Sequence, residues 1–345
     1  LTNLVGVVGS LTYTYKNSYI VNGNMRIDAS NKFGDASNER LLPIWSISGR
    51  WNLHENVLQN CGWINLLALK MSFGYQGNMS AQDSPRLVIQ KKGTNTFFNE
   101  YYSLIDKYPN PNLRWEKTST YNVDLEFAMF RNKLRGSFGY YYRYTKDAFL
   151  EKKVSMVNGV ENYTVNAGNI RNQGFEFTFN FTPINTMLNQ AAVSGRKRGF
   201  VWRLDPNFGS VFNQLIDKVK PRNKPLQDEI KYTDYLTGKV YLAGRPVNTF
   251  YSYKFKGLNP ENGSPMFYNT DRYVMEGDQE VDMGEVYNNM DKEEVFRTVM
   301  TRSGCREPFL QGGISNYFGW RNLGLSINLA YSIGAKIRMF KMYPT

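Results

Sequence analysis

The chain has 345 residues, a formal net charge of +12 and a 15% share of aromatic residues, with 24 Tyr and 22 Phe. Mean hydropathy is −0.50, and no apolar run approaches the ~18 residues of a membrane-spanning helix, which excludes helical membrane spans. The basic residues are spread over many segments without a zinc-ligand spacing or an RNA-binding aromatic signature, so we expect no nucleic-acid partner.

The first part of the chain consists of segments in which apolar and polar residues alternate. Because successive strand side chains point to opposite sides of a sheet, this alternation predicts β-strands. Lys16-Asn17 and His54–Gly62 would connect them in pairs, and residues 77–113, rich in Asn, Pro and Gly, would form a loop. The strands expected here are Leu4–Tyr15, Tyr19–Asp28, Leu42–Leu53 and Leu66–Gln76.

Residues 119–145 give the clearest signal, two alternating strands joined by the polar turn Phe130-Arg131-Asn132-Lys133. Each strand has about the 9–11 residues that a tilted strand needs to cross a bilayer. One face of the first strand carries Asn122, Asp124 and Glu126. The apolar side chains expected on the other face of this hairpin are Tyr121, Val123, Leu125, Phe127 and Met129, then Leu134, Phe138, Tyr140, Tyr142 and Tyr144.

Farther along the chain, alternating segments are separated by longer irregular stretches. In Gly174–Phe181 every second residue from Phe175 is a phenylalanine, and we expect these rings to contact lipid. Residues 205–248 and 270–308 do not alternate, although Asp291–Met300 predicts a short helix. The strands expected in this part are Ala148–Val157, Gly174–Phe181, Gly199–Leu204, Thr249–Phe255, Gln311–Gly319 and Leu323–Ile333, with a turn at Asn259–Gly263.

Short turns alternate with long connections, which is typical of an all-β, antiparallel transmembrane β-barrel with short periplasmic turns and long external loops. A soluble β-sandwich is the alternative, because half-buried strands also alternate. The asymmetry of the loops and the length of the strands favour the barrel. The turns expected on the periplasmic side are residues 54–62, 131–133, 183–197 and 320–322, and the expected external loops are 29–40, 77–113, 158–173 and 268–309.

The sequence offers little catalytic chemistry. His54, the single histidine, lies in a predicted turn, and no nucleophile constellation, metal-ligand spacing or nucleotide-binding motif accompanies it. Asp124 and Glu126 share a strand face, where we expect them to pair with basic neighbours such as Arg143 or Arg135. We therefore expect a protein that is not an enzyme and that needs no cofactor or metal.

Aromatic side chains of the predicted loop 77–113 are the candidates for ligand contact. Phe97, Phe98, Tyr101 and Tyr102 could stack on sugar faces or pack against peptide side chains. Packing within the loop is the alternative explanation. Tryptophans at strand ends are instead expected in girdles at the membrane interfaces, namely Trp51, Trp63, Trp115 and Trp320.

Several motifs in a fixed order resemble one protein family. Asn110-Pro111-Asn112-Leu113-Arg114-Trp115-Glu116-Lys117-Thr118, followed by a strand, a tight turn and Tyr140-Tyr141-Tyr142, is similar to the SusC/RagA family of outer-membrane transporters. Their shared order over nearly the whole chain makes the resemblance specific, although residues 182–248 match least well. The other matching stretches are Tyr19–Gly34, Leu69–Asn78, Asn166–Glu176, Gly244–Val247, Gly257–Pro265 and Gly312–Asn316.

The resemblance implies a TonB-dependent nutrient importer of the bacterial outer membrane, working with a SusD-like surface lipoprotein as a lid and taking up oligosaccharides or peptides. Family members carry a plug inside the barrel and an N-terminal segment that contacts TonB. We expect residues 1–345 to be part of the barrel, with about 12–14 strands, and the plug domain, the TonB-contacting segment and the final strands to be absent from this chain. The alternative is a non-transporting outer-membrane barrel or surface adhesin that binds ligand through its long loops.

Overall fold

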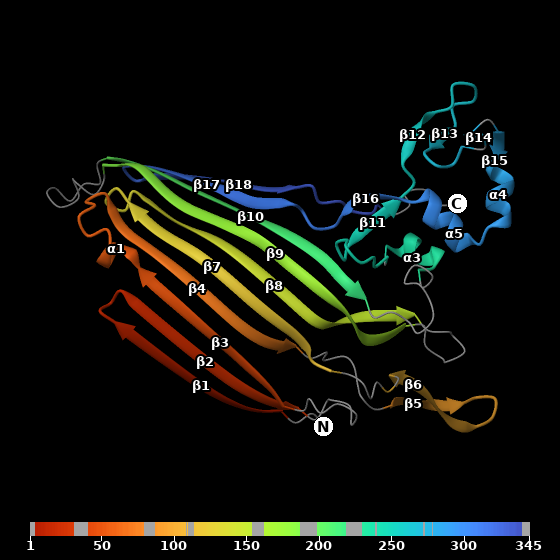
Figure 1. Ribbon diagram of the computed structural model, residues 1–345, viewed down its shortest axis with the longest axis horizontal. Helices are drawn as coiled ribbons and strands as arrows, with labels where there is room; N and C mark the ends of the chain where they lie inside the picture. The colour runs from red at the N-terminus through yellow and green to blue at the C-terminus, as the bar shows by residue number, and fades with distance from the viewer. Residues whose placement is uncertain are drawn as a thin grey trace. The chain divides into compact units, whose positions relative to one another are not determined.

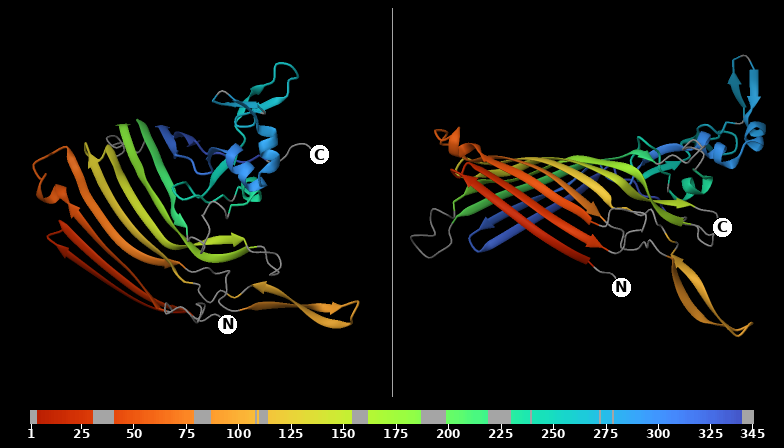
Figure 2. Two further views of the ribbon diagram at one scale, coloured as in Figure 1. Left: turned by 45° about the vertical axis from the view of Figure 1, so that its right-hand side comes forward. Right: turned by 60° about the horizontal axis from the view of Figure 1, so that its bottom comes forward.

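The structure, a computed structural model, describes residues 4–30, 41–78, 87–107, 109, 114–153, 162–186, 199–218, 230–238, 240–271, 273–277 and 279–339 (Figure 1). Ten strands form one main sheet, in which they lie side by side (Figure 2). The shortest of them have 11 residues, enough to cross a bilayer. In sheet order they are β1 (Leu4–Tyr15), β2 (Tyr19–Ser30), β3 (Leu41–Asn52), β4 (Ile64–Asn78), β7 (Glu116–Met129), β8 (Leu134–Lys153), β9 (Asn162–Asn185), β10 (Phe200–Lys218), β17 (Leu310–Trp320) and β18 (Leu323–Ile333).

The strand register gives the main sheet one apolar and one polar face. Residues directly opposite each other on neighbouring strands point to the same side, so Val123 shares a face with Met71, and Asp124 shares the other face with Lys70. Met71 and Val123 are 53% and 42% exposed, so protein atoms of the described residues leave the apolar face largely uncovered. The faces predicted for the hairpin 119–145 are confirmed by the pairs Tyr121 and Tyr142, Val123 and Tyr140, and Leu125 and Phe138.

Phe175 and Phe177 of β9 also lie on the apolar face, because they pair with Tyr140 and Phe138 of β8. Phe177 contacts the rings of Phe179 and Phe208, at centroid distances of 5.2 and 4.9 Å. The phenylalanine row therefore belongs to the apolar face, on which Phe175, Phe177, Phe179 and Phe181 are half-buried. Its contact with lipid stays a prediction.

The three tightest turns, after β1, β7 and β17, lie at one end of the main sheet. Because the strands follow one another in sheet order, the connections after β1, β3, β7, β9 and β17 lie at one end, the turn end, and those after β2, β4, β8 and β10 lie at the other, the connector end. Hydrogen bonds link neighbouring turns along the turn end: Asn52 N to Ser18 O (2.8 Å), Phe130 N to Trp63 O (2.7 Å) and Thr182 N to Lys133 O (2.7 Å). The predicted asymmetry is confirmed, whereas the assignment of the turn end to the periplasm stays a prediction.

Some expectations at the connector end were wrong. The supposed loop 77–113 contains a hairpin of β5 (Val88–Asn95) and β6 (Glu100–Lys107). Residues 148–153 are not a separate strand but continue β8 across a bulge after Thr145, and β9 has already begun at Asn162. Alternation of apolar and polar residues predicts a strand only where one face of the strand is in an apolar environment. Strand extensions that are polar on both faces are therefore not predicted. The same reason explains β10, which continues to Lys218 through a stretch expected to be irregular.

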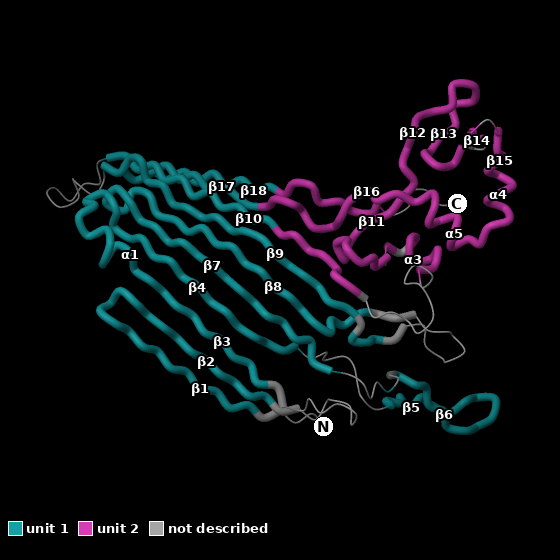
Figure 3. Tube along the Cα trace, in the orientation of Figure 1, with its two compact units in different colours: residues 1–210, 312–331 teal, residues 211–311, 332–345 magenta. Residues whose placement is uncertain are grey.

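The chain divides into two compact units (Figure 3). Unit 1 comprises Leu1–Ser210 with Gly312–Tyr331, and unit 2 comprises Val211–Gln311 with Ser332–Thr345. Unit 2 has a small core of Ile230, Tyr235, Val240 and Tyr251, against which Leu242, Phe296 and Met300 pack. Its elements include α3 (Tyr232–Thr237), β11 (Thr249–Ser252), β12 (Phe255–Leu258), β13 (Pro265–Phe267), β14 (Tyr273–Glu276), β15 (Gln279–Asp282), α4 (Met283–Asn289), α5 (Lys292–Val299) and β16 (Thr301–Cys305).

Within unit 2, the helix expected at Asp291–Met300 and the turn at Asn259–Gly263 are confirmed. Asp291 and Met300 are the residues that flank α5, and Gly263 N donates to Asn259 O between β12 and β13. The strand expected at Thr249–Phe255 is divided between β11, which pairs with β16, and β12. The described residues thus place ten strands in the main sheet, fewer than expected, and the others in small two-stranded sheets.

The helices are short. The helix α1 (Leu53–Asn56) lies between β3 and β4, and α5, the longest helix among the described residues, has 8 residues. Among the described residues, no helix combines the length and the apolar character required to span a membrane.

Candidate functional site

Charged side chains from three neighbouring strands meet on the polar face. Glu126 of β7 accepts a hydrogen bond from Arg50 Nη1 of β3 at 2.9 Å, and its other carboxylate oxygen pairs with Lys70 Nζ of β4. Arg50 Nε also donates to Asn52 Oδ1 at 2.8 Å. Asp124 lies directly opposite Lys70 in the strand register. We call Arg50, Lys70, Asp124 and Glu126 the charged cluster.

The cluster corrects the partners predicted for the two carboxylates. We expected Arg143 or Arg135 of β8, but the residues opposite Asp124 and Glu126 on that strand are Gly139 and Ser137. A Cβ atom at Gly139 would lie only 2.5 Å from Asp124 Oδ1, so a larger residue there would require the Asp124 side chain to move. The actual basic partners come from β3 and β4, which precede β7 in the sheet.

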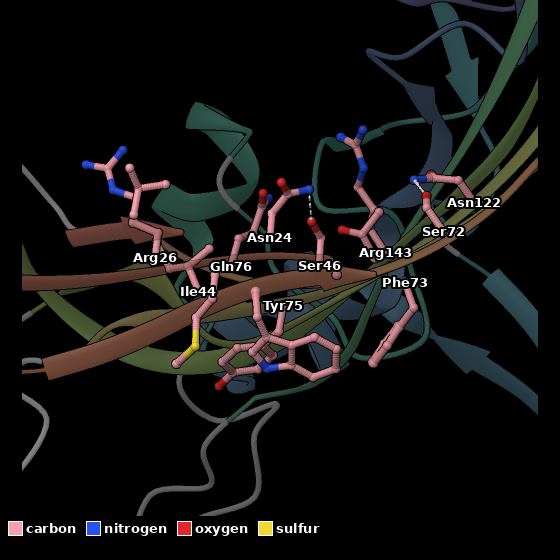
Figure 4. Close-up of a pocket in the computed structure, with 15 residues that line it drawn as sticks. Asn24, Arg26, Ile44, Ser46, Ser72, Phe73, Tyr75, Gln76, Asn122 and Arg143 are labelled. Atoms are coloured by element: carbon pink, nitrogen blue, oxygen red, sulfur yellow. Dashed lines mark hydrogen bonds between the residues drawn. The ribbon is translucent and has the colours of Figure 1, made fainter. Parts of the chain in front are cut away.

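Uncharged polar groups continue the polar face toward the connector end. Asn122 Nδ2 donates to Ser72 Oγ at 2.9 Å, and Asn24 Nδ2 donates to Ser46 Oγ at 3.4 Å. These groups line part of a hollow of about 450 Å³ that extends over β1 to β4, β7 and β8 and also includes apolar side chains such as Trp45 and Phe73 (Figure 4). Such donors and acceptors can replace water around sugar hydroxyls or peptide groups. The polar side chains lining the hollow include Asn24, Arg26, Ser46, Ser72, Asn122 and Arg143.

The predicted ligand-contact residues gather on the hairpin β5–β6. Phe97 and Phe98 lie in its turn, 89% and 72% exposed, with ring centroids 5.7 Å apart. Tyr101 and Tyr102 follow on β6, and Lys91 Nζ lies 4.3 Å above the Tyr101 ring. Asn95 Oδ1 shapes the turn by accepting from Phe97 N at 2.8 Å. The four rings therefore share one exposed hairpin, and their contact with a ligand stays a prediction.

His54 lies beside the sheet rather than in a catalytic arrangement. Its Nε2 is 3.3 Å from Glu55 Oε1, and its Nδ1 is 3.4 Å from the carbonyl oxygen of Leu67. Among the described residues, no group of three or more His, Cys, Asp or Glu side chains is placed to hold a metal ion. The described side chains of the site form a polar, charged surface.

Two features of the site were missed by sequence reasoning. The roles of Arg50 and Lys70 depend on the pairing of β4 with β7, which are separated by the connection that holds β5 and β6. Aligning the alternating faces of β4 and β7 would have placed Lys70 opposite Asp124. The folding of the connection between β10 and β17 into unit 2 had no comparable signal, since its strands are only three to five residues long.

Comparison with known proteins agrees with this architecture. The family model described as "TonB dependent receptor-like, beta-barrel" matches residues 2–332. A TonB-dependent receptor of Formosa agariphila is 25% identical over 355 residues, covering 97% of this chain and 32% of the relative. The TonB-dependent receptor SusC of Bacteroides thetaiotaomicron is 27% identical over 275 residues, covering 76% of this chain and 26% of SusC.

A solved structure shows the same fold. The structure of the RagAB peptide transporter matches with a TM-score of 0.76 at 21% identity, covering 96% of this chain and 34% of that chain. This chain thus spans about a third or less of the length of the proteins that it matches. The chain belongs to the TonB-dependent receptor-like β-barrel family, whose members are proteins of the outer membrane.

Proposed function

We propose that this chain forms part of the barrel wall of an importer that takes up oligosaccharides or peptides. The observation that carries the proposal is the charged cluster, which lies on a sheet whose opposite face is apolar. Such a wall can meet lipid on one side and line a water-filled path on the other. Lumen-facing charges stay hydrated and therefore do not oppose membrane insertion.

The rest of the protein would supply the other parts of the importer. Because the chain spans about a third of the length of its relatives, we propose that a plug domain, a TonB-contacting segment and further barrel strands come from other residues of the protein. A SusD-like surface lipoprotein would close over the mouth at the connector end. The RagAB structure, described as a peptide transporter, makes peptides one substrate class to test, beside the oligosaccharides.

The connector end would contact the substrate and the lid. The hairpin β5–β6 supports this role because Phe97, Phe98 and Tyr101 are exposed rings on a connection at that end. Aromatic faces stack on sugars and pack against peptide side chains. The proposed contact residues are Phe97, Phe98, Tyr101 and Tyr102.

Energised uptake tests the transport proposal. Cells with the intact protein should accumulate a labelled oligosaccharide or peptide, and an uncoupler of the inner-membrane proton gradient should abolish accumulation but not surface binding. Surface binding without uncoupler-sensitive uptake would favour the alternative, a non-transporting barrel or adhesin. Co-purification of a surface lipoprotein with the intact protein would support the lid.

Ring removal tests the proposed contacts. The double variant Phe97→Ala/Phe98→Ala should weaken substrate binding about tenfold, as expected for the loss of two stacking rings. Phe130→Ala is the matched control, because Phe130 is 51% exposed, stacks on another ring, Trp63, and lies at the turn end. Equal binding by both variants would remove the hairpin from the substrate site while leaving the transport proposal open to the uptake assay.

A further inference from the structure

The turn end carries an unusual set of basic residues. In three turns a basic residue directly precedes asparagine: Lys16-Asn17, Arg131-Asn132 and Arg321-Asn322. All three cations are exposed, and Lys133 adds a fourth exposed cation to the second of these turns. In the described connections of this end, Glu55 is the sole acidic side chain. We call Lys16, Arg131, Lys133 and Arg321 the basic collar.

Turn geometry does not explain the collar. Lys16, Arg131 and Arg321 have φ angles of 49°, 55° and 52°, in the left-handed region that glycine and asparagine adopt most easily. A lysine or arginine in this conformation costs roughly 1–2 kcal/mol relative to the right-handed one. Strained positions that keep an unfavourable residue point to a role for its side chain. A lysine or arginine thus adopts the left-handed conformation in each of three separate turns.

The collar lies next to a band of exposed aromatic rings. Lys16 Nζ is 5.3 Å from the centroid of the Tyr15 ring, and Arg321 Cζ is 4.9 Å from that of Trp320. Between these turns, Trp63 stacks on Phe130 with a centroid distance of 5.7 Å. The three rings Trp63, Phe130 and Trp320 are 50%, 51% and 53% exposed. Exposed tryptophans beside an apolar membrane face lie at the level of lipid headgroups.

We propose that the basic collar binds the headgroup phosphates of anionic phospholipids, such as phosphatidylglycerol, in the membrane leaflet at the turn end. The rings place the cations just beyond the apolar face, where headgroup phosphates lie. Lysine and arginine near a membrane surface attract anionic lipid, and arginine also matches phosphate through two parallel hydrogen bonds. The proposal rests on the outer-membrane location of the chain and not on its proposed cargo.

Native mass spectrometry of the intact protein tests the collar. The protein, in detergent with equimolar phosphatidylglycerol and phosphatidylcholine, should retain phosphatidylglycerol at least about fivefold over phosphatidylcholine, the factor expected from a single cation at the surface. In the variant Lys16→Asn/Arg131→Asn/Lys133→Asn/Arg321→Asn this preference should fall to near one. Asparagine tolerates the left-handed backbone, so the turns themselves are retained.

A control variant removes equal charge from the connection between β10 and β17 and from the segment after β18. Lys231, Lys254, Lys292 and Lys336 are exposed there, and their joint replacement by asparagine should leave the preference unchanged. Arg131→Lys/Arg321→Lys should also retain it. The proposal would be overturned if the collar variant kept its preference for phosphatidylglycerol or if the control variant lost this preference to the same extent. It would also be overturned if inorganic phosphate at equal concentration displaced phosphatidylglycerol, or if the protein retained lipopolysaccharide more strongly than phosphatidylglycerol. Migration of unheated samples in gels verifies that every variant is folded.

Discussion

Glu126 shows how a charged side chain is accommodated on the polar face of the main sheet. Its carboxylate is shared by Arg50 and Lys70, and the side chains are 27%, 27% and 37% exposed. Ion pairs this exposed contribute about 0–1 kcal/mol each, because water screens them. The cluster therefore contributes mainly a fixed arrangement of compensated charges on the polar face.

Glu126→Gln should lower the free energy of unfolding by about 1 kcal/mol, since Arg50 and Lys70 lose their shared partner and repel each other. Urea titration of the protein in lipid vesicles measures this difference. Asp106→Asn is the matched control, because Asp106 is an exposed carboxylate on the hairpin β5–β6. A loss as large in the control would contradict the assigned role of the cluster.

Gly174 marks a close approach between neighbouring strands. A Cβ atom there would overlap the carbonyl oxygen of Ser210 and lie 2.7 Å from Tyr141 Oη. Gly174→Ala should therefore destabilise the protein by about 1–3 kcal/mol, as overpacking usually does. Gly49→Ala should cost less than about 0.5 kcal/mol, because a Cβ atom at Gly49 meets nothing within 4 Å. Urea titration of both variants checks the contrast, and similar values for the two would refute it.

At the scale of a strand, β9 separates the two environments of the wall. Phe177 lies on the apolar face opposite Phe138, whereas Thr178 lies on the polar face, where its hydroxyl is 2.8 Å from Ser137 Oγ. Phe177→Arg should destabilise the protein folded in lipid vesicles by about 2–4 kcal/mol near the bilayer midplane, and Thr178→Arg should have little effect. Equal losses for the two variants would mean that the faces are wrongly assigned.

The strands could be predicted where apolar and polar residues alternate and not elsewhere. The turn at Arg131-Asn132 and the faces of β7 and β8 follow from periodicity alone, because the two faces of these strands differ in polarity. At the connector end this constraint is lost, so β5, β6 and the far part of β10 escaped prediction. The ion pairs of Glu126 were missed for another reason, since they depend on the register between strands distant in sequence. The four aromatic residues expected to contact ligand lie on a hairpin instead of the expected loop, and their contact with a ligand stays a prediction.

At the scale of the whole molecule, the wall has two faces and two ends with different tasks. We propose that lipid contacts the apolar face and that water and solute contact the polar face. The lid and the substrate would contact the connector end, and the tight turns lie at the other end. The family model matches residues 2–332, which is nearly the whole chain. The central claim is therefore that alternate residues of one strand face lipid and water.

Spin-label accessibility along β7 of the intact protein in lipid vesicles tests this claim most directly. Single cysteines would replace residues 119 to 125 one at a time, after Cys61 and Cys305, both free thiols, are changed to serine. Labels at Tyr121, Val123 and Leu125 should be reached by oxygen dissolved in the bilayer, and labels at Asn122 and Asp124 by a water-soluble nickel complex. A profile without this period of two, or with the apolar positions reached by neither reagent, would contradict the account.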